Sequence, residues 1–544
     1  MQGRKEYNPK LMYQLHLDNL VPKDNYYRQL DQVLDLEFLY KATAEYYGAE
    51  GQESIDPVVF IKISLVGYLN NINSDRRLIE YCGNCLDVRL FIRYDLDETL
   101  PWHSTISRTR QLYGEEVFLA LFRKVLSMCV HKGMVRGKRQ AIDSAFIKAN
   151  ASMDSLVEKE VVEDAGMYLD ELNEGSEYKV SKTKKAIVEK HHAWKVKAYK
   201  GQPSNQNTKQ LNDFGEPIRP KYLSNHTHYS PTDPDARISV KVGKSRQLNY
   251  YGQIAVDDAH HVITGAMADY ADQRDSQCLP AILEQTIENL NENEIRTEQI
   301  AADTGYSSGE ALRYCEEHAI EAYIPNFGLY KPTREGFIYN KELDRYECTR
   351  GNKAILPFRQ IFTDKKGYQK RVYRSDNSKC KNCPLRSSCI GKSDFKKLDD
   401  SIDKPYYDRM HQRMQTQYAR KISKIRSSTV EPVLGTLINY LNMKRVNTRG
   451  INKANKHVLM AALCYNLKKY MKFKSPKVIS VIKSMDMNKI GDFFNISEAV
   501  SGLINGFLIN MRLMEAPCHF KILTSNDRSL ESYAAEQVEI FFHG

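Results

Sequence analysis

The sequence predicts an α/β protein: a central mixed β-sheet with flanking helices, preceded by an all-α region and interrupted by a small cysteine-rich insert. Three observations carry this prediction. Apolar residues recur at helical spacing up to about residue 130, strand-like and helix-like stretches then alternate, and four cysteines gather late in the chain.

The region before residue 130 contains amphipathic stretches such as LDQVLDLEFLYKATAEYY and DPVVFIKISLVGYLNNI. In both, apolar residues lie three and four positions apart, which is typical of helices that bury one face. Asp56 followed by Pro57 is a favourable helix start, because the acid caps the helix and proline suits its first position. We therefore expect a compact helical domain over residues 1–130.

The middle of the chain predicts strands and helices in a defined order. A strand in QAIDSAFIKANAS is followed by two strands with a turn at residues 257–260, a helix in SQCLPAILEQTIENL, a strand in EIRTEQIAADTGYSS, and a helix and strand in SGEALRYCEEHAIEAYIP. This is the order of an RNase H-like core, a five-stranded mixed sheet whose first and fourth strands are neighbours. Residues 155–235 are strongly charged and predict a polar insertion with one helix near 180–192.

Two of these strands present an aspartate. Asp143 lies inside an apolar run, and Asp303 follows the apolar residues 300–302. If the first and fourth strands are neighbours, the two carboxylates lie close together, and they repel each other unless a cation sits between them. Mg²⁺ prefers such oxygen ligands and keeps positions open for water and phosphate. A single Asp in such a stretch is more often a cap or turn residue, so the joint arrangement carries the argument.

Glu431 is the third candidate acid. Pro432 follows it, as in the first turn of a helix. An apolar stripe on the same helix would dock it on the sheet; the stripe consists of Leu434, Leu437, Ile438 and Leu441.

The chain resembles the DDE transposases of bacterial insertion sequences, in the branch with a helical N-terminal domain and a four-cysteine insert between the second Asp and the Glu. The resemblance rests on short motifs in two parts of the chain. The motifs of the N-terminal domain are SIDPVVFIKISLVGYL, SDRRLIE and LPWHSTISRTR. Those of the catalytic part are AIDSAFIKANAS, DPDAR, YYGQIAVD, AADTGYSS, VEPVLG, TRG and HVLMAALCYNLKKY. The resemblance extends over roughly residues 10–472. It implies Asp143, Asp303 and Glu431 as a catalytic triad that holds Mg²⁺ or Mn²⁺.

The resemblance implies binding to the element's terminal inverted repeats, metal-dependent cleavage of its ends, and joining of the 3′-OH to target DNA. Two ends must be joined, so it also implies a homodimer or larger assembly. Two other functions stay open: an RNase H-like nuclease that cuts without joining, and an inactive or domesticated DNA-binding protein. Related enzymes often place an Arg four residues before the Glu and a Lys seven residues after it. This chain has Ser427 and Ile438 at those positions. Arg426 lies one residue before the expected Arg position, and Lys444 or Arg445 can substitute for the Lys further along the helix.

Four domains follow from these arguments. They are a helical DNA-binding domain (1–130), an RNase H-like catalytic core (136–335 and 425–472, with the insertion 155–235), a cysteine-rich insert (336–424) and a C-terminal helical extension of unknown role (475–544).

The insert contains Cys348, Cys380, Cys383 and Cys389. The pair at 380 and 383 has the spacing of a zinc turn, and the other two cysteines would complete a structural Zn²⁺ site. Reduced thiols in a small hairpin domain are the alternative.

Candidate DNA contacts are basic or aromatic residues near these elements: Arg76, Arg77, His103, Arg108, Arg110, Trp194, Arg426, Lys444, Arg445 and Arg449. Solvated helix faces explain the four arginines before residue 130 equally well, and a capping or core role is an alternative for His103. The net charge of +11 favours a polyanionic partner only weakly. The N-terminus has no apolar signal segment and the apolar runs are too short for a bilayer, so we expect a cytoplasmic, nucleoid-associated protein.

Overall fold

The computed structural model describes residues 16–48, 54–158, 224–225, 228–240, 245–328, 330–364 and 367–474. The expected helix near 180–192, the candidate Trp194 and the extension 475–544 lie outside these residues. In the part described, no helix is long and apolar enough to cross a membrane.

The first part of the described chain is helical, as predicted. Its helices are α1 (Leu17–Leu20), α2 (Tyr26–Val33), α3 (Phe38–Thr43), η1 (Ala44–Tyr46), α4 (Pro57–Leu69), α5 (Asp75–Asn84), α6 (Leu86–Ile92), α7 (His103–Leu112) and α8 (Glu115–His131). The predicted cap of α4 is present, because the Asp56 carboxylate accepts hydrogen bonds from the backbone N–H groups of Val58 and Val59, at 2.6 and 3.1 Å. Most residues of α4 are buried, so this helix forms the centre of the region.

A mixed sheet forms the middle of the molecule. Its strands are β1 (Arg139–Lys148), β4 (Arg237–Ser239), β5 (Gln247–Asp257), β6 (Ile263–Tyr270), β7 (Gln299–Ala301) and β8 (Glu321–Tyr323), in the order β4-β5-β1-β7-β8 with β6 paired to β5. β1 is antiparallel to β5 and parallel to β7. The strand that contains Asp143 and the strand that precedes Asp303 are therefore neighbours, as the sequence predicts.

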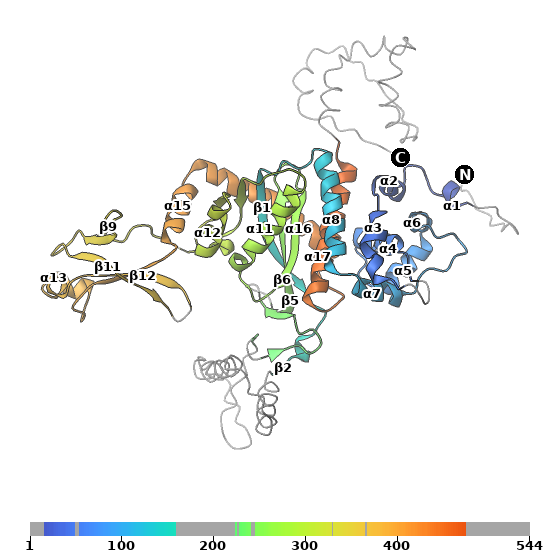
Figure 1. Cartoon of the computed structure of the whole chain (residues 1–544). Helices are drawn as coiled ribbons and strands as arrows, with labels where there is room; N and C mark the ends of the chain where they lie inside the picture. The colour runs from blue at the N-terminus through green and yellow to red at the C-terminus, as the bar shows by residue number, and fades with distance from the viewer. Residues whose placement is uncertain are drawn as a thin grey trace, which may run out of the picture.

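Helices cover both faces of this sheet. On one face lie α11 (Asp275–Asn291) and α12 (Gly309–Glu317), which share a core cluster with Ile142 of β1. On the other lie α8, α16 (Gln417–Tyr440) and α17 (Ile451–Lys472), which share a cluster with Ala141 and Ala145. This second cluster continues without a break into the helices of the N-terminal region. Figure 1 shows α8 and α17 between the sheet and those helices.

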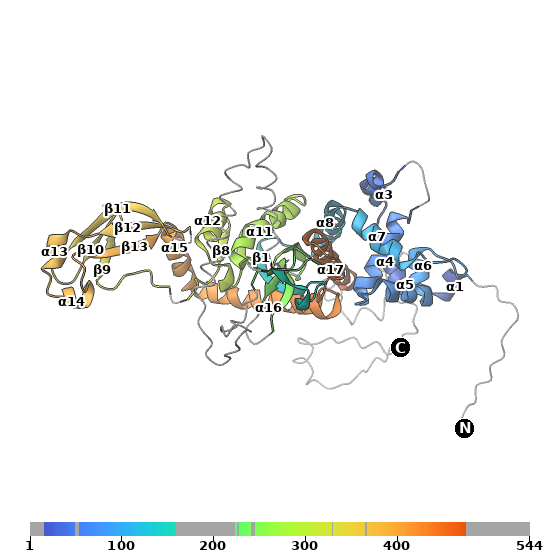
Figure 2. The ribbon, with the colours of Figure 1, turned by 90° about the horizontal axis from the view of Figure 1, so that it is seen from below.

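The cysteines belong to a second, antiparallel sheet. It consists of β9 (Phe337–Asn340), β10 (Arg345–Cys348), β11 (Ile355–Thr363), β12 (Gln369–Arg374) and β13 (Lys397–Ser401), with the short helices α13 (Asn377–Lys381) and α14 (Arg386–Cys389). It has its own small core around Tyr346, Leu356 and Tyr373. Both views place it at the end of the molecule opposite α1–α7 (Figures 1 and 2).

The helix α15 (Lys404–Met414) falls within the range predicted for the insert (336–424), but it packs against α12 and β8 of the central region. Its Met410 is buried in the core cluster of α11 and α12, which explains this position. The remaining short elements are η2 (Met153–Ser155), η3 (Thr304–Tyr306) and a two-stranded antiparallel sheet of β2 (Val157–Glu158) and β3 (His228–Tyr229).

Candidate active site

Asp143 and Asp303 come to the same edge of the central sheet because β1 and β7 run parallel. Ala141 pairs with Ala301 in that register, and each aspartate lies two residues further along its own chain. Asp303 then caps η3 and accepts a hydrogen bond from the backbone N–H of Gly305, at 2.8 Å. The distance between two carboxylates far apart in sequence is thus set by the sheet.

The side chain of Asp143 is largely enclosed, with 18% of its surface exposed. Burial raises the pKa of this carboxyl, and the negative charge of Asp303 raises it further, against the opposing effects of the Ser144 backbone N–H and the Arg426 guanidinium. The ionised form of Asp143 is therefore disfavoured where it lies, as is common for titratable groups at functional sites, and a bound cation would favour it.

Glu431 reaches this edge from α16. Alternation along β1 places Asp143 on the same face as Ala141 and Ala145, and α16 packs on that face. The predicted docking stripe is confirmed: Leu434, Leu437 and Leu441 are buried, and Ile438 is partly buried against the same core.

The prediction that Glu431 lies in the first turn of its helix is wrong. α16 begins at Gln417, where Thr416 caps it, and Pro432 lies in the helix interior. Proline cannot donate to the carbonyl of Ser428 one turn earlier, but Ser428 is exposed, so water can satisfy that group. Packing of the buried residues on both sides of the proline holds the helix together.

Arg426 joins two of the three acids. Its Nη1 donates to Asp143 Oδ2 at 3.1 Å, and its Nη2 donates to Glu431 Oε1 at 3.3 Å. The side chain of Arg426 is 14% exposed, whereas that of Glu431 is 58% exposed. A guanidinium group therefore lies between the carboxylate buried on the sheet and the carboxylate at the surface of the helix.

A fourth carboxylate, Asp275, lies beside the site and was missed from the sequence. It accepts a hydrogen bond from Ser144 Oγ at 2.7 Å. The position of a Cβ on Gly305 would lie 2.7 Å from Asp275 Oδ2 and 3.0 Å from Asp303 Oδ1, so both acids border the same small space. The strand order could have identified Asp275 from the sequence. β6 runs parallel to β1, so a residue that follows β6 reaches the same edge of the sheet as Asp143.

The oxygen donors at this edge fit a hard divalent cation in kind. In the described ranges, however, no three acidic, histidine or cysteine side chains are grouped so that they could hold one metal ion. The guanidinium of Arg426 provides a physical reason, because it separates Asp143 from Glu431 while neutralising both.

The four cysteines of the insert line one small cavity. The Cys348 thiol donates to the carbonyl of Arg350 at 2.9 Å, and Cys380 Sγ lies 3.0 Å from Ser375 Oγ. They are not arranged as a metal site in the described structure, and they are free thiols there. The structure does not support the predicted zinc.

The predicted DNA contacts of the helical region divide into two kinds. Arg76, Arg77 and Arg108 are exposed on α5 and α7. Arg110 instead makes a bidentate ion pair with Asp75: Nη2 donates to Oδ1 at 2.7 Å and Nη1 donates to Oδ2 at 3.0 Å. This pair links α7 to α5. His103 begins α7 and its ring lies 5.0 Å from that of Trp102, whose side chain is exposed.

Arg426 lies on α16, but the other predicted contacts near the third acid lie beyond it, because the helix ends at Tyr440. Lys444 and Arg445 are exposed in a segment that continues alongside the end of β1, where the carbonyl of Lys444 accepts from the backbone N–H of Lys148 at 3.1 Å. Arg449, also exposed, follows in the turn that leads into α17. The segment that contains Lys444 and Arg445 thus lies beside the strand that carries the first acid.

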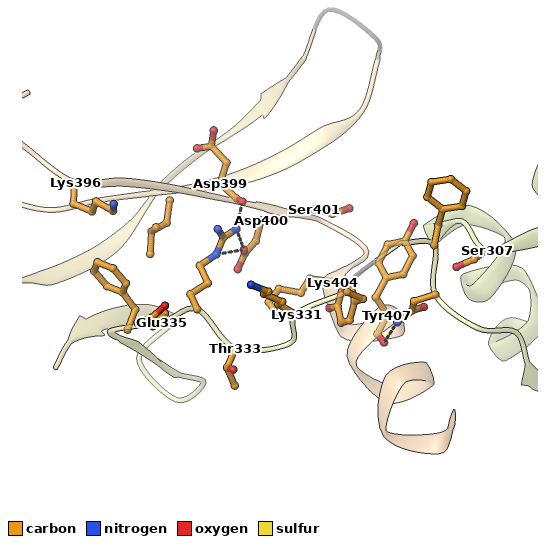
Figure 3. A pocket seen from close by; sticks show the side chains of 16 residues that line it. Ser307, Lys331, Thr333, Glu335, Lys396, Asp399, Asp400, Ser401, Lys404 and Tyr407 are labelled. Carbon is orange, nitrogen blue, oxygen red and sulfur yellow. Dashed lines mark hydrogen bonds and ion pairs between the residues drawn. The ribbon is translucent and has the colours of Figure 1, made fainter. Parts of the chain in front are cut away.

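A groove lies where the insert meets the central region (Figure 3). Ser307 lines its central-region end, and Arg334 and Lys404 contribute positive charge. Arg334 pairs with Asp400 at 2.6 Å and Lys404 with Asp408 at 2.8 Å. Both cations are thus neutralised by carboxylates of the protein itself.

Two regions of the chain match known protein families. Residues 15–112 match a family described as a transposase domain, and residues 347–471 match a family described as a transposase DDE domain. No curated protein matches the chain. The second match includes Arg426 and Glu431, whereas Asp143 and Asp303 lie outside both matched regions.

Proposed function

Because the chain belongs to the DDE transposases of insertion sequences, we propose that it binds the terminal inverted repeats of its own element, cleaves the phosphodiester at each end and joins the freed 3′-OH to target DNA. The match to the DDE domain implies an RNase H-like core, and the strand order β6-β5-β1-β7-β8 supports that assignment. Because two ends must be brought together, the proposal includes a homodimer.

One observation carries the proposal: Asp143 and Asp303 follow equivalent positions of adjacent parallel strands, and the helix that packs on β1 supplies Glu431. We assign these three residues as the catalytic acids. Together they would hold Mg²⁺ or Mn²⁺, which when bound stabilises charge on the attacking and leaving oxygens of an in-line displacement. The acids act as ligands and not as nucleophiles, so no covalent phospho-enzyme is expected.

The protein's own groups prepare this site. The backbone N–H of Gly305 fixes Asp303, and the backbone N–H of Ser144 contacts the other oxygen of Asp143, Oδ1, at 2.8 Å. Packing of α16 sets the height of Glu431 above the sheet. Exposed cations on α5, on α7 and after α16 would contact DNA phosphates; they are Arg76, Arg77, Arg108, Lys444, Arg445 and Arg449.

The test uses the full-length protein with DNA that carries the two ends of its element, in Mg²⁺ or Mn²⁺. Nicked ends and joined products support the proposal. Asp143→Asn, Asp303→Asn and Glu431→Gln should each abolish both products while end binding is retained. Glu317→Gln, which changes an exposed acid at the opposite end of α12 from Asp303, is the matched control and should keep both activities.

Other outcomes separate the two alternatives. Nicks without joining, even on DNA with pre-cut ends, would indicate an RNase H-like nuclease. Binding without any cleavage by the unaltered protein would indicate a domesticated DNA-binding protein. The zinc assignment stays a prediction, and the metal content of the purified protein, measured by elemental mass spectrometry, decides it.

A further inference from the structure

Arg426 occupies an unusual position for an arginine on a helix surface. Glu431 lies five positions after Arg426, one more than the longest offset at which side chains of a helix normally meet. Even so, the Arg426 guanidinium reaches both Glu431 and Asp143. It is also mostly enclosed, at 14% exposure. An arginine that only makes the helix surface polar would extend into solvent, whereas the Arg426 side chain lies against the sheet.

The charges around it explain why it turns inward. Asp143 and Asp303 border the same edge of the sheet, and Asp275 lies beside them. Without a cation these carboxylates repel one another. A guanidinium keeps its charge at any relevant pH and can donate to two acids at once. Arg426 therefore supplies the positive charge that the cluster requires in the absence of metal.

Arg426 and a metal ion shared by the two acids compete for the same oxygen atoms. Asp143 Oδ2 and Glu431 Oε1 point at the guanidinium, and these are oxygens that a shared cation would need. A divalent ion offers twice the charge at a shorter distance, since Mg²⁺–oxygen contacts are about 2.0–2.1 Å. The guanidinium must therefore leave before the two acids can converge.

We propose that Arg426 is a displaceable counter-ion, which pairs with Asp143 and Glu431 until a divalent cation replaces it. The proposal rests on the proposed function, because it takes these two acids as metal ligands. It adds that metal binding and release of the guanidinium are one coupled event. Once released, Arg426 remains on α16 beside the site, where it can pair with a DNA phosphate.

Binding of Mn²⁺ to the full-length protein without DNA tests this coupling, with isothermal titration calorimetry as the measurement. Arg426→Gln removes the competing charge, so the affinity for Mn²⁺ should rise by at least about tenfold, the effect of losing one charge-assisted hydrogen bond. Arg420→Gln is the matched control, because Arg420 is an exposed arginine of the same helix, and it should leave the affinity unchanged. An equal or weaker affinity in Arg426→Gln would overturn the proposal.

Asp143→Asn separates this inference from the function on which it rests. If the unaltered protein binds Mn²⁺ at a site that Asp143→Asn removes, the metal site stands, and only the Arg426→Gln result decides the counter-ion. If Arg426→Gln creates such a site where the unaltered protein shows none, the counter-ion is supported strongly. If neither protein has a site sensitive to Asp143→Asn, both the metal site and the counter-ion are excluded.

Chemical modification of arginine gives a second, independent readout. Phenylglyoxal should modify Arg426 slowly in metal-free protein, because the guanidinium is enclosed and paired. Saturating Mg²⁺ should increase the modification of Arg426 several-fold, as measured by peptide mass spectrometry, while that of Arg420 stays constant. Unchanged or slower modification of Arg426 with Mg²⁺ would show that the guanidinium is not displaced.

Discussion

Asp143 and Asp257 are enclosed carboxylates on the neighbouring strands β1 and β5, the first partly and the second fully buried, but their partners differ. Asp257 is fully buried and accepts from the backbone N–H groups of Gly137 and Ala259, at 2.7 and 2.9 Å, and from the side chain of Gln140 at 3.2 Å. Asp143 has one backbone donor, and its other oxygen faces the side chain of Arg426. Burial raises the pKa of both carboxyls.

The difference shows which buried acids are structural. The oxygens of Asp257 are used by rigid groups of the main chain, so the carboxylate fixes the turn before β1 and the turn after β5. Oδ2 of Asp143 accepts a hydrogen bond only from the side chain of Arg426, which can move away. An acid enclosed in an apolar strand is therefore a candidate metal ligand only when at least one of its oxygens is paired with a side chain that a metal ion can replace.

The largest effect expected from this comparison is the destabilisation caused by Asp257→Ala. The substitution removes the acceptor of the buried Gly137 N–H, of the part-buried Ala259 N–H and of the Gln140 side chain. A buried donor left without an acceptor costs about 1–3 kcal/mol. We expect a loss of about 3 kcal/mol or more in the free energy of unfolding, measured by urea denaturation. A loss below about 0.5 kcal/mol, the range of ordinary surface substitutions, would mean that Asp257 is not a structural acid.

Asp143→Asn should have a smaller effect of the opposite sign. Because the folded-state pKa of Asp143 is raised above its usual 3.8, the ionised carboxylate opposes folding, and this penalty is present above the folded pKa. The melting temperature of the metal-free variant should therefore exceed that of the unaltered protein near pH 7, by a few degrees at most. The gap should close as the pH falls through the folded pKa towards the unfolded value, because the carboxyl then becomes neutral in both states. A melting temperature that falls at pH 7 and stays low at acid pH would make Asp143 structural, like Asp257.

Glu431→Gln should change stability least. Its side chain is 58% exposed, and exposed ion pairs contribute about 0–1 kcal/mol. We expect a change of less than about 0.5 kcal/mol in urea denaturation, although the same variant should lose DNA cleavage. A large loss of stability would show that its pairing with Arg426 holds α16 on the sheet.

The parts of this structure that were predictable from sequence are those set by local pattern and strand order. The α4 cap at Asp56, the docking stripe of α16 and the adjacency of β1 and β7 all follow from such signals. Periodicity shows which face of an element is buried, and the order of elements limits how a mixed sheet is wound. Asp143 and Asp303 could therefore be paired across 160 residues.

What was missed depends on tertiary contacts. Pro432 suggested a helix start, but packing carries α16 through the proline. Asp275 was not singled out from the sequence, and only the direction of β6 places it at the site. The inward turn of Arg426 follows from charge at the edge of the sheet, which the spacing along its own helix does not reveal.

The central claim is that Asp143, Asp303 and Glu431 share divalent cations at one edge of the central sheet. The most direct measurement is a crystal structure of the full-length protein with element-end DNA and Mn²⁺, in which anomalous scattering locates the metal. The account predicts a Mn²⁺ peak in contact with all three carboxylates and the guanidinium of Arg426 moved away from Asp143. A peak away from these residues, or no peak with Arg426 still bridging Asp143 and Glu431, would contradict it.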